Sequence, residues 1–355
     1  MMNPLELQLD YPFGDTLPAT GEAQRIAPGL FWLRMPLPFA LDHINLWLLS
    51  DNFGAPDRAA GGWSVIDCGV ATDATRAGWE AVFASSLQGL PIRRVLATHC
   101  HPDHVGLADW LCRRWQAPLW MTTGEYGFAR MMSAALPGVD GPSALPHLRR
   151  HGLCDPALLA QIEARKHYYP SLVPAMPASY ARLQDGQMVV IGAHGWRVIT
   201  GFGHSPEHAA LYCVELGVLI SGDMVLPRIS TNVSVFAIEP EANPLQLYLD
   251  ALGKFADLPE QTLVLPSHGK PFRGLHTRIA QLCEHHGLRL AEVMQACVQW
   301  QSAADIVPLM FRRALDVHQL GFAMGEALAH LHLLWHEGKL ARQTGADAVM
   351  RFRVM

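Results

Sequence analysis

The feature that most constrains this chain is a group of four side chains of metal-ligand type within six residues. His99, His101, Asp103 and His104 directly follow a short apolar run at residues 94–97. The run predicts a β-strand, and the residues after it predict the start of a helix. His99 and His101 share one side of an extended chain, because residues two apart face the same way. A lone histidine is usually a core or surface residue, but four such groups at one strand end predict a metal site.

Three further candidate ligands stand where later strands are expected to end. His204, Asp223 and His268 each follow a short strand-like run, and each stands close to a glycine that leaves room for a close approach. In layered α/β folds, ligand sites collect at strand ends. Because packing alone does not explain this recurrence, we expect these residues to join the first four in one site.

The order of the apolar runs predicts an α/β layered fold. Strands are expected at residues 30–35, 44–49, 63–66, 94–97, 118–121, 188–191, 196–200, 210–214, 218–221 and 262–265. Helices are expected from residue 72 and over residues 105–115. Residues 124–182 instead give helical pieces broken by prolines, with Asp155 as the N-cap of one helix, and they are interpreted as an insertion.

The C-terminal part of the chain has a different, mostly helical pattern. Helices are expected at residues 275–300, 303–313 and 324–337, and a β-hairpin at 339–342 and 349–354. Three helices and a terminal hairpin describe a winged-helix module. We therefore divide the chain into a first domain over residues 1–280, with the insertion, and a winged-helix-like domain over residues 281–355.

The composition favours a globular protein with a large core. Half of the 355 residues are hydrophobic and 17% are charged, which excludes global disorder. The formal net charge of −5 at pH 7 gives no electrostatic basis for binding nucleic acid or an anionic membrane. Seven cysteines without a Cys-x-x-Cys pair indicate reduced thiols, and we find neither a signal-peptide pattern nor a membrane-spanning run. We therefore expect a cytoplasmic protein that binds no membrane.

These motifs resemble those of the metallo-β-lactamase superfamily of hydrolases, over most of residues 25–272. The resemblance implies an αββα sandwich, in which two mixed sheets lie face to face with helices on both outer sides. It implies a first metal site with His99, His101 and His204, a second with Asp103, His104 and His268, and Asp223 as the bridging carboxylate. Asp67, in the sequence Val-Ile-Asp-Cys-Gly, matches the aspartate behind the metals and is expected to orient a ligand histidine.

The chemistry expected of such a site is hydrolysis by a metal-bridging hydroxide. Imidazole and carboxylate ligands suit zinc, while iron or manganese in the second position stays open. Two divalent ions lower the pKa of a shared water from 15.7 towards about 7, which gives hydroxide at neutral pH. Asp103 is then both a ligand and the catalytic proton acceptor. We expect a dinuclear zinc-dependent hydrolase.

Neighbouring residues have less specific interpretations. Cys100 points away from the metals on extended chain, so a small buried residue is favoured over a ligand or nucleophile. His208, four residues after His204, is expected to support the site rather than to ligate. The apolar residues of the insertion are either ordinary core or a lid over the cleft, and Tyr168 and Tyr169 are the candidate substrate-binding residues.

The substrate class follows from what the resemblance disfavours. A true β-lactamase is disfavoured because Asp103 and His104 stand where a cysteine would contribute to the second site. A processing nuclease is disfavoured by the negative charge, and a flavodiiron oxygen reductase by His101, where it would carry a carboxylate. A small ester, acyl thioester or lactone remains as the expected substrate.

The branch within the superfamily is expected from the motifs and the tail. The motifs resemble the glyoxalase II branch, and the tail resembles lactamase-beta-2-like proteins, some of which are linked to cleavage of single-stranded RNA. A phosphodiesterase or endoribonuclease acting on single-stranded RNA is therefore the alternative function. Residues 282–355 carry seven basic and seven acidic residues, so no duplex DNA partner is expected. A homodimer is left open.

Overall fold

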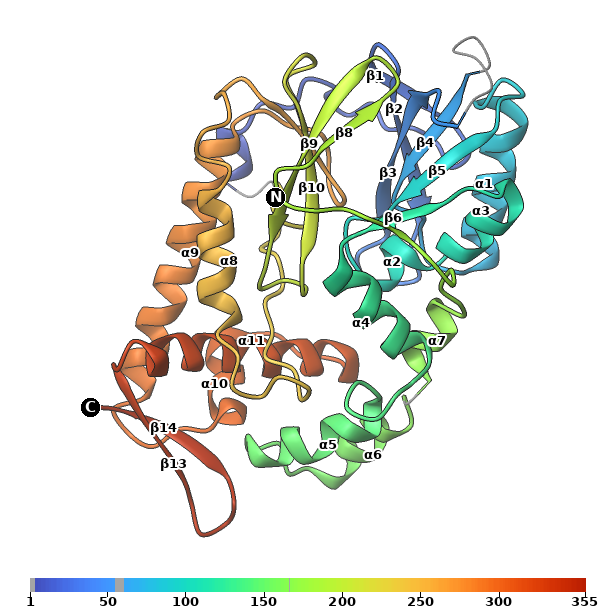
Figure 1. The fold of residues 1–355 in the computed structure, drawn as a ribbon. Coiled ribbons are helices and arrows are strands. Elements are labelled where there is room, and N and C mark those ends of the chain that lie inside the picture. Colours follow the sequence, from blue (N-terminus) through green and yellow to red (C-terminus); the bar gives the residue numbers. More distant parts are fainter. Residues whose placement is uncertain (1–3, 55–60, 166) are drawn as a thin grey trace.

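The computed structural model describes residues 4–54, 61–165 and 167–355, and its centre is formed by two β-sheets that face each other (Figure 1). The first sheet consists, in spatial order, of β1 (Gln24–Ala27), β2 (Leu30–Pro36), β3 (His43–Asp51), β4 (Gly62–Ile66), β5 (Ile92–Leu96), β6 (Leu119–Met121) and β7 (Ala181–Arg182). Neighbours are antiparallel from β1 to β4 and parallel from β4 to β7. The sheet is therefore mixed, as expected.

The second sheet is also mixed. Its spatial order is β12 (Leu263–Pro266), β11 (Val218–Gly222), β10 (His208–Cys213), β9 (His194–Gly201) and β8 (Met188–Ile191). Only β11 and β12 run parallel. The strands expected from the sequence are present, and β1 and β7 are additional edge strands that were not expected.

The sheets are apolar on both faces, because each is covered on both sides. Along β2, Leu30 and Trp32 face the second sheet, whereas Leu33 and Met35 face the helices on the outer side. Trp32 lies opposite Trp47 of β3 in the register, and the two rings stack at 6.3 Å between centroids. Burial of such residues on both faces of the sheet explains the continuous hydrophobic runs.

Helices complete the four layers. Helix α1 (Asp73–Ser85) and α3 (Ala108–Trp115) cover the first sheet, and α8 (Pro244–Gly253) and α9 (Leu275–Ala296) cover the second (Figure 1). A 3-10 turn, η1 (Glu6–Gln8), precedes the first sheet. The αββα sandwich expected from the sequence is confirmed.

One expected helix is interrupted near the site. Residues 105–115 do not form a continuous helix, because a single turn, α2 (Pro102–Val105), ends before α3 begins at Ala108. At Gly106 between them, a Cβ atom would lie 2.7 Å from the carbonyl oxygen of Gly69. This close approach lets the turn that carries Asp103 pack tightly against the end of β4.

The described residues of the insertion form four helices below the sheets (Figure 1). They are α4 (Thr123–Ser133), α5 (Gly141–Arg150), α6 (Pro156–Glu163) and α7 (Tyr168–Leu172). Asp155 caps α6 as expected, since its carboxylate accepts the N–H groups of Ala157 and Leu158. The insertion is not helical to its end, because residues 181 and 182 form β7, which pairs with β6.

The C-terminal unit contains three helices and a hairpin. They are α9, α10 (Ala303–Met310), α11 (Val317–His336), β13 (Leu340–Thr344) and β14 (Met350–Val354). Helix α11 begins seven residues before the expected position, with a capping box formed by Asp316 and Gln319. Its buried residues share one apolar cluster with α8 and the second sheet, including Leu245, Leu328 and Phe352. The division at residue 280 stays a prediction.

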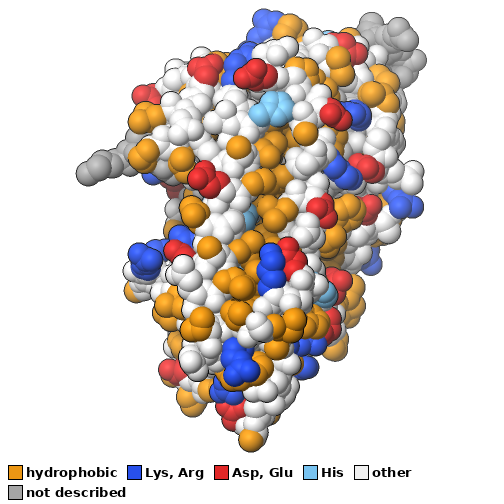
Figure 2. Space-filling model, turned by 90° about the vertical axis from the view of Figure 1, so that its left-hand side faces the viewer, with side chains coloured by type: hydrophobic (Ala, Val, Ile, Leu, Met, Phe, Trp, Pro, Cys, Tyr) orange, Lys and Arg blue, Asp and Glu red, His pale blue; other side chains and the backbone are white. Residues whose placement is uncertain are grey.

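The surface has a mixed charge pattern on the face that carries α9. On this face, shown in Figure 2, Lys and Arg side chains are interspersed with Asp and Glu, and hydrophobic side chains form a band along the middle. Within the described ranges, no helix is long and apolar enough to cross a membrane.

Candidate metal centre

The turn after β5 is held by a buried carboxylate. Asp67 accepts hydrogen bonds from the N–H of Thr98 at 2.7 Å and from its hydroxyl at 2.8 Å. The same carboxylate accepts the Nδ1–H of His104 at 2.8 Å. Asp67 has φ of +63°, in the left-handed region that Asp tolerates better than most residues. Asp67 therefore fixes the ring of His104 and leaves its Nε2 facing the site.

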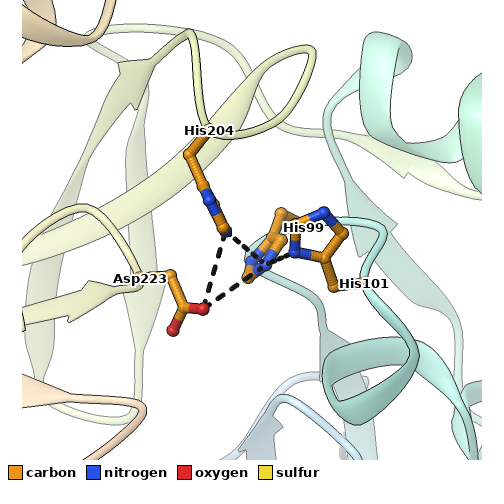
Figure 3. A group of neighbouring side chains, drawn as sticks. All are labelled: His99, His101, His204 and Asp223. Atoms are coloured by element: carbon orange, nitrogen blue, oxygen red, sulfur yellow. Dashed lines mark hydrogen bonds and ion pairs between the residues drawn. The ribbon is translucent and has the colours of Figure 1, made fainter. Parts of the chain in front are cut away.

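The first ligand group joins three histidines and one aspartate from three strand ends (Figure 3). The Nε2 atom of His99 lies 3.0 Å from Nδ1 of His101 and 3.2 Å from Nε2 of His204. The Nδ1–H of His204 donates to the carbonyl of Asn232 at 2.7 Å, so its Nε2 presents a lone pair when the ring is neutral. The Oδ2 atom of Asp223 lies 3.5 Å from that Nε2.

The second ligand group is formed by Asp103, His104 and His268. The Nε2 atoms of His104 and His268 lie 3.6 Å and 3.3 Å from Oδ2 of Asp103. Asp223 faces this group as well, with Oδ1 3.6 Å from His268 and Oδ2 3.7 Å from His104. The structure thus brings together all seven residues that the sequence singled out as metal ligands.

The electrostatics of the cluster favour the binding of a metal cation. Burial would raise the pKa of Asp103, but the charge of His104 and the hydrogen bond with His268 outweigh it and lower the pKa to about 2. Burial would lower the pKa of His268, but Asp223 and Asp103 raise it to about 10. The carboxylates of Asp103 and Asp223 are therefore both ionised and largely buried. Among the described residues, only histidines lie within salt-bridge distance of them.

Unsatisfied polar atoms point to the same fit. Among the described residues, Nε2 of His104 and Oδ1 of Asp223 have no hydrogen-bond partner, although both are buried. Such atoms are normally satisfied, because burying an unpaired polar group costs free energy. Imidazole nitrogens and carboxylate oxygens are ligands of divalent metals. The donor set therefore fits one metal ion in each group.

Comparison with known proteins decides the family. The family model described as "Metallo-beta-lactamase superfamily" matches residues 58–268, which is more than half of the chain. The chain belongs to the metallo-β-lactamase superfamily. A second model, "Metallo-beta-lactamase-like, C-terminal domain", matches residues 290–355. The chain is therefore a metallo-hydrolase of this superfamily, and its C-terminal residues match the model of a C-terminal domain found in the same superfamily.

Individual relatives of the metallo-β-lactamase superfamily agree. A crystal structure of a beta-lactamase domain protein from Burkholderia ambifaria is 58% identical, covers 99% of this chain and 100% of that one, and has a TM-score of 0.94. A metallo-beta-lactamase family protein from Thermus thermophilus is 28% identical over 93% of this chain and 100% of that one, with a TM-score of 0.75. The probable metallo-hydrolase YqjP of Bacillus subtilis is 24% identical over 85% of this chain and 91% of its own length.

His208 supports the aspartate of this metallo-hydrolase without belonging to either ligand group. Its Nε2 accepts the N–H of Asp223 at 3.1 Å, and burial lowers the pKa of His208, which keeps the ring neutral. Gly222 makes this contact possible, because a Cβ there would lie 2.2 Å from the same nitrogen. The hydroxyl of Thr231 donates to the carbonyl of Asp223 at 2.5 Å. The turn that presents Asp223 is therefore held from both sides.

Glu125, at the start of α4, is a supporting residue that the sequence did not predict. Its buried carboxylate accepts the N–H of Cys100 at 2.8 Å, the hydroxyl of Ser205 at 2.5 Å and the N–H of Glu207 at 2.6 Å. It thereby ties the turn with His99 and His101 to the loop that follows His204. The Cys100 thiol is buried, and burial raises its pKa well above the usual value, as expected of a packing residue.

The two candidate substrate residues lie on α7 and differ in their surroundings. The Tyr169 hydroxyl donates to the carbonyl of Cys100, so this ring braces the ligand turn. Tyr168 is partly exposed, and the guanidinium of Arg165 lies 4.1 Å from its ring centroid. The structure therefore places Tyr169 against the turn with the candidate ligands, and Tyr168 next to it on α7, and both side chains are partly exposed.

Proposed function

We propose that the protein is a dinuclear, zinc-dependent hydrolase of a small acyl ester, acyl thioester or lactone. The observation that carries this proposal is the position of Asp223, whose Oδ2 lies 3.5 Å from Nε2 of His204 and whose Oδ1 lies 3.6 Å from Nε2 of His268. A carboxylate between two ligand groups can be shared by two cations. Zinc is favoured by the histidine-rich donor set, with iron and manganese as competitors.

The residues of the chain divide the work of hydrolysis. Divalent ions held by these residues would lower the pKa of a bound water towards about 7, and so would supply hydroxide at neutral pH. Asp103 is ionised at neutral pH, because His104 and His268 lower the pKa of its carboxyl, and its side chain is 16% exposed. We therefore assign to its carboxylate the role of proton acceptor. Asp67, Glu125 and His208 keep the ligands in place.

An acyl substrate is supported by the apolar insertion. Tyr169 contacts the ligand turn directly, and the same apolar cluster includes Leu172, Val173 and Met176. Cleavage of single-stranded RNA has less support, because the C-terminal residues from 282 carry as many acidic as basic residues. Hydrolysis of a small acyl compound is therefore the better supported function.

Metal analysis and a substrate screen test this proposal. Elemental analysis of protein purified without chelator is expected to give close to two metal ions per chain, and Asp223→Ala should lower both metal content and turnover. The screen compares thioesters, esters, lactones, phosphodiesters and single-stranded RNA. At most one ion per chain with full activity, or cleavage of RNA alone, would overturn the proposal. Glu284→Gln, at an exposed position of α9, is the matched control.

Substitution of the two tyrosines tests the substrate side of the site. Tyr168→Ala and Tyr169→Ala are each expected to change KM or the acyl preference, and Tyr168→Ala should do so while the metal content stays constant. Tyr169→Phe separates the hydrogen bond to Cys100 from the ring, because it removes only the hydroxyl. Unchanged kinetics in both alanine variants would mean that α7 has a structural role only and does not contact the substrate.

A further inference from the structure

A cavity of about 310 Å³ lies between the insertion and α11. In Figure 1 these two parts of the chain, far apart in sequence, meet below the sheets. The lining is mostly apolar and comes from the insertion, from the segment after Asp223 and from α11, including Met132, Leu148, Ile162, Val235, Phe322 and Leu328. We call this space the α11 cavity.

Two walls of the α11 cavity are joined to the metal centre. Tyr169 lines the cavity and donates its hydroxyl to Cys100, which stands between two ligand histidines. Val235 lines it from the segment that contains Asn232, whose carbonyl accepts the Nδ1–H of His204. A molecule in the α11 cavity would therefore lie against the elements that hold the ligands.

Two glycines of α11 lie along the α11 cavity. Gly321 and Gly325 line it four residues apart, on one face of the helix. At Gly325 a Cβ would lie 2.6 Å from the Cβ of Ser234, so this glycine permits close packing. Gly321 is exposed, and a Cβ there would meet no heavy atom within 4 Å. A side chain at position 321 can therefore be added at the edge of the cavity without a clash.

We infer that the α11 cavity binds the unbranched acyl chain of the substrate, so that the C-terminal unit supplies one wall of the substrate site. This inference rests on the proposed acyl hydrolase function. Apolar lining favours a hydrocarbon chain over a polar group. The volume is at the lower end of the range of about 300–1,000 Å³ for small-molecule sites, which favours chains of short to medium length.

A side chain at position 321 should shorten the accepted chain. Gly321→Ala and Gly321→Leu are compared with wild type on a series of N-acetylcysteamine thioesters from acetyl to dodecanoyl. For octanoyl and longer chains, Gly321→Leu should lower kcat/KM by about tenfold or more, the loss expected when about two methylene groups stay unburied. The acetyl thioester should be unaffected, and Gly321→Ala should give a smaller change.

The matched control is Gly287→Leu on α9. Gly287 is also an exposed helix glycine whose Cβ would meet no heavy atom within 4 Å, but it does not line the α11 cavity. This variant should keep the wild-type chain-length profile. Leucine favours helix over glycine, so neither leucine variant is expected to lower the melting temperature.

A binding measurement separates this inference from the proposed function. Calorimetric titration with octan-1-ol, which has no acyl group to hydrolyse, should give binding to the metal-loaded wild type and to Gly287→Leu, and weaker binding to Gly321→Leu. If octan-1-ol binds in this pattern but no acyl compound is hydrolysed, the cavity assignment stands and the acyl hydrolase function fails. Equal chain-length profiles and equal octan-1-ol binding in all variants would overturn the cavity assignment.

Discussion

Three ligand histidines are each fixed through the ring nitrogen that faces away from the site. His104 donates to Asp67, His204 to the carbonyl of Asn232 and His268 to the carbonyl of His43. Each hydrogen bond selects one tautomer and turns the other nitrogen towards the cluster. The ligand atoms are therefore arranged by the fold itself.

Asp67→Asn tests how much this arrangement contributes to metal affinity. The amide cannot accept a hydrogen bond at the nitrogen that replaces one carboxylate oxygen, and it carries no charge to favour the bound form. We expect zinc affinity to fall by about 10–100-fold, the usual effect of losing such a partner. Competition with a chromophoric chelator measures it. Asparagine also tolerates the left-handed backbone of residue 67. Asp73→Asn, exposed on α1, is the control, and equal affinity in both variants would contradict this role.

Glu326 gives the protein a pH-dependent stability away from the ligands. Burial raises the pKa of this α11 carboxyl to about 7, whereas in the unfolded chain it titrates near its ordinary value of about 4.3. Between these values the folded state holds a proton that the unfolded state has lost, so stability falls as the pH rises through this window. Glu326→Gln should therefore be more stable than wild type at about pH 8, by about 1–3 kcal/mol.

Urea unfolding at several pH values measures this difference. The gain in Glu326→Gln should shrink as the pH falls and nearly vanish at about pH 4 and below, where the wild-type carboxyl is protonated in the folded and in most of the unfolded state. Glu284→Gln, exposed on α9, should show no such pH dependence. A pH-independent difference would show that the Glu326 carboxyl is not titrating in this window.

The clustering of the candidate ligands could be predicted from sequence, but most of the residues that support them could not. The ligand residues stand beside glycines at strand ends, so their residue types and positions carry the signal. The backbone carbonyls of Asn232 and His43 cannot be recognised in the sequence, because every residue has a carbonyl group. Glu125 shows no motif either, since its three partners come together only when α4 folds against the loop after His204.

At the scale of the elements, a buried ion pair joins the two sheets. Arg94 of β5 donates to the carboxylate of Asp51 of β3 at 2.8 Å and to the carbonyl of Val190 in β8. Burial would raise the pKa of Asp51, but the hydrogen bond from Ser64 and the charge of Arg94 outweigh it and lower the pKa. The pair therefore contributes stability above the ordinary pKa of aspartate, and this contribution is lost as the pH falls below it.

Arg94→Met should be strongly destabilising, because it leaves the Asp51 carboxylate buried without its cation. Loss of one partner of a buried pair costs about 3–5 kcal/mol, and chemical unfolding at neutral pH would measure it. Arg113→Met is the comparison, since the side chain of Arg113 is 77% exposed and its pair with Asp109 lies on the surface of α3. That variant should lose less than about 1 kcal/mol. Similar losses in the two variants would contradict the bridging role of Arg94.

The element boundaries that sequence misplaced have identifiable physical causes. Helix α11 begins at Val317, although Gly321 lowers the helix preference of its first turns. The capping box of Asp316 and Gln319 satisfies backbone groups at this end and offsets that preference. The break at Gly106 has a different cause, a close backbone contact with Gly69 that sequence patterns do not report.

For the whole molecule, the position of α11 decides which partners the C-terminal unit can meet. Leu328, His330, Leu331 and His332 of this helix are buried. The helix contacts α8, α9, α10 and, from the insertion, α6. Helix α11 therefore packs between other helices of the chain, and the helix that a winged-helix protein would place in DNA is largely buried.

We predict that the protein does not bind duplex DNA. A helix that reads the major groove must be exposed and usually carries Arg or Lys towards the bases and phosphates. Helix α11 is largely buried and contains neither residue, and on the face in Figure 2 the charges of both signs are interspersed. Because phosphate contacts supply essentially all non-specific affinity, little binding is expected even at low salt. Fluorescence anisotropy with a labelled duplex measures it, and micromolar or tighter binding that weakens steeply with added salt would refute the prediction.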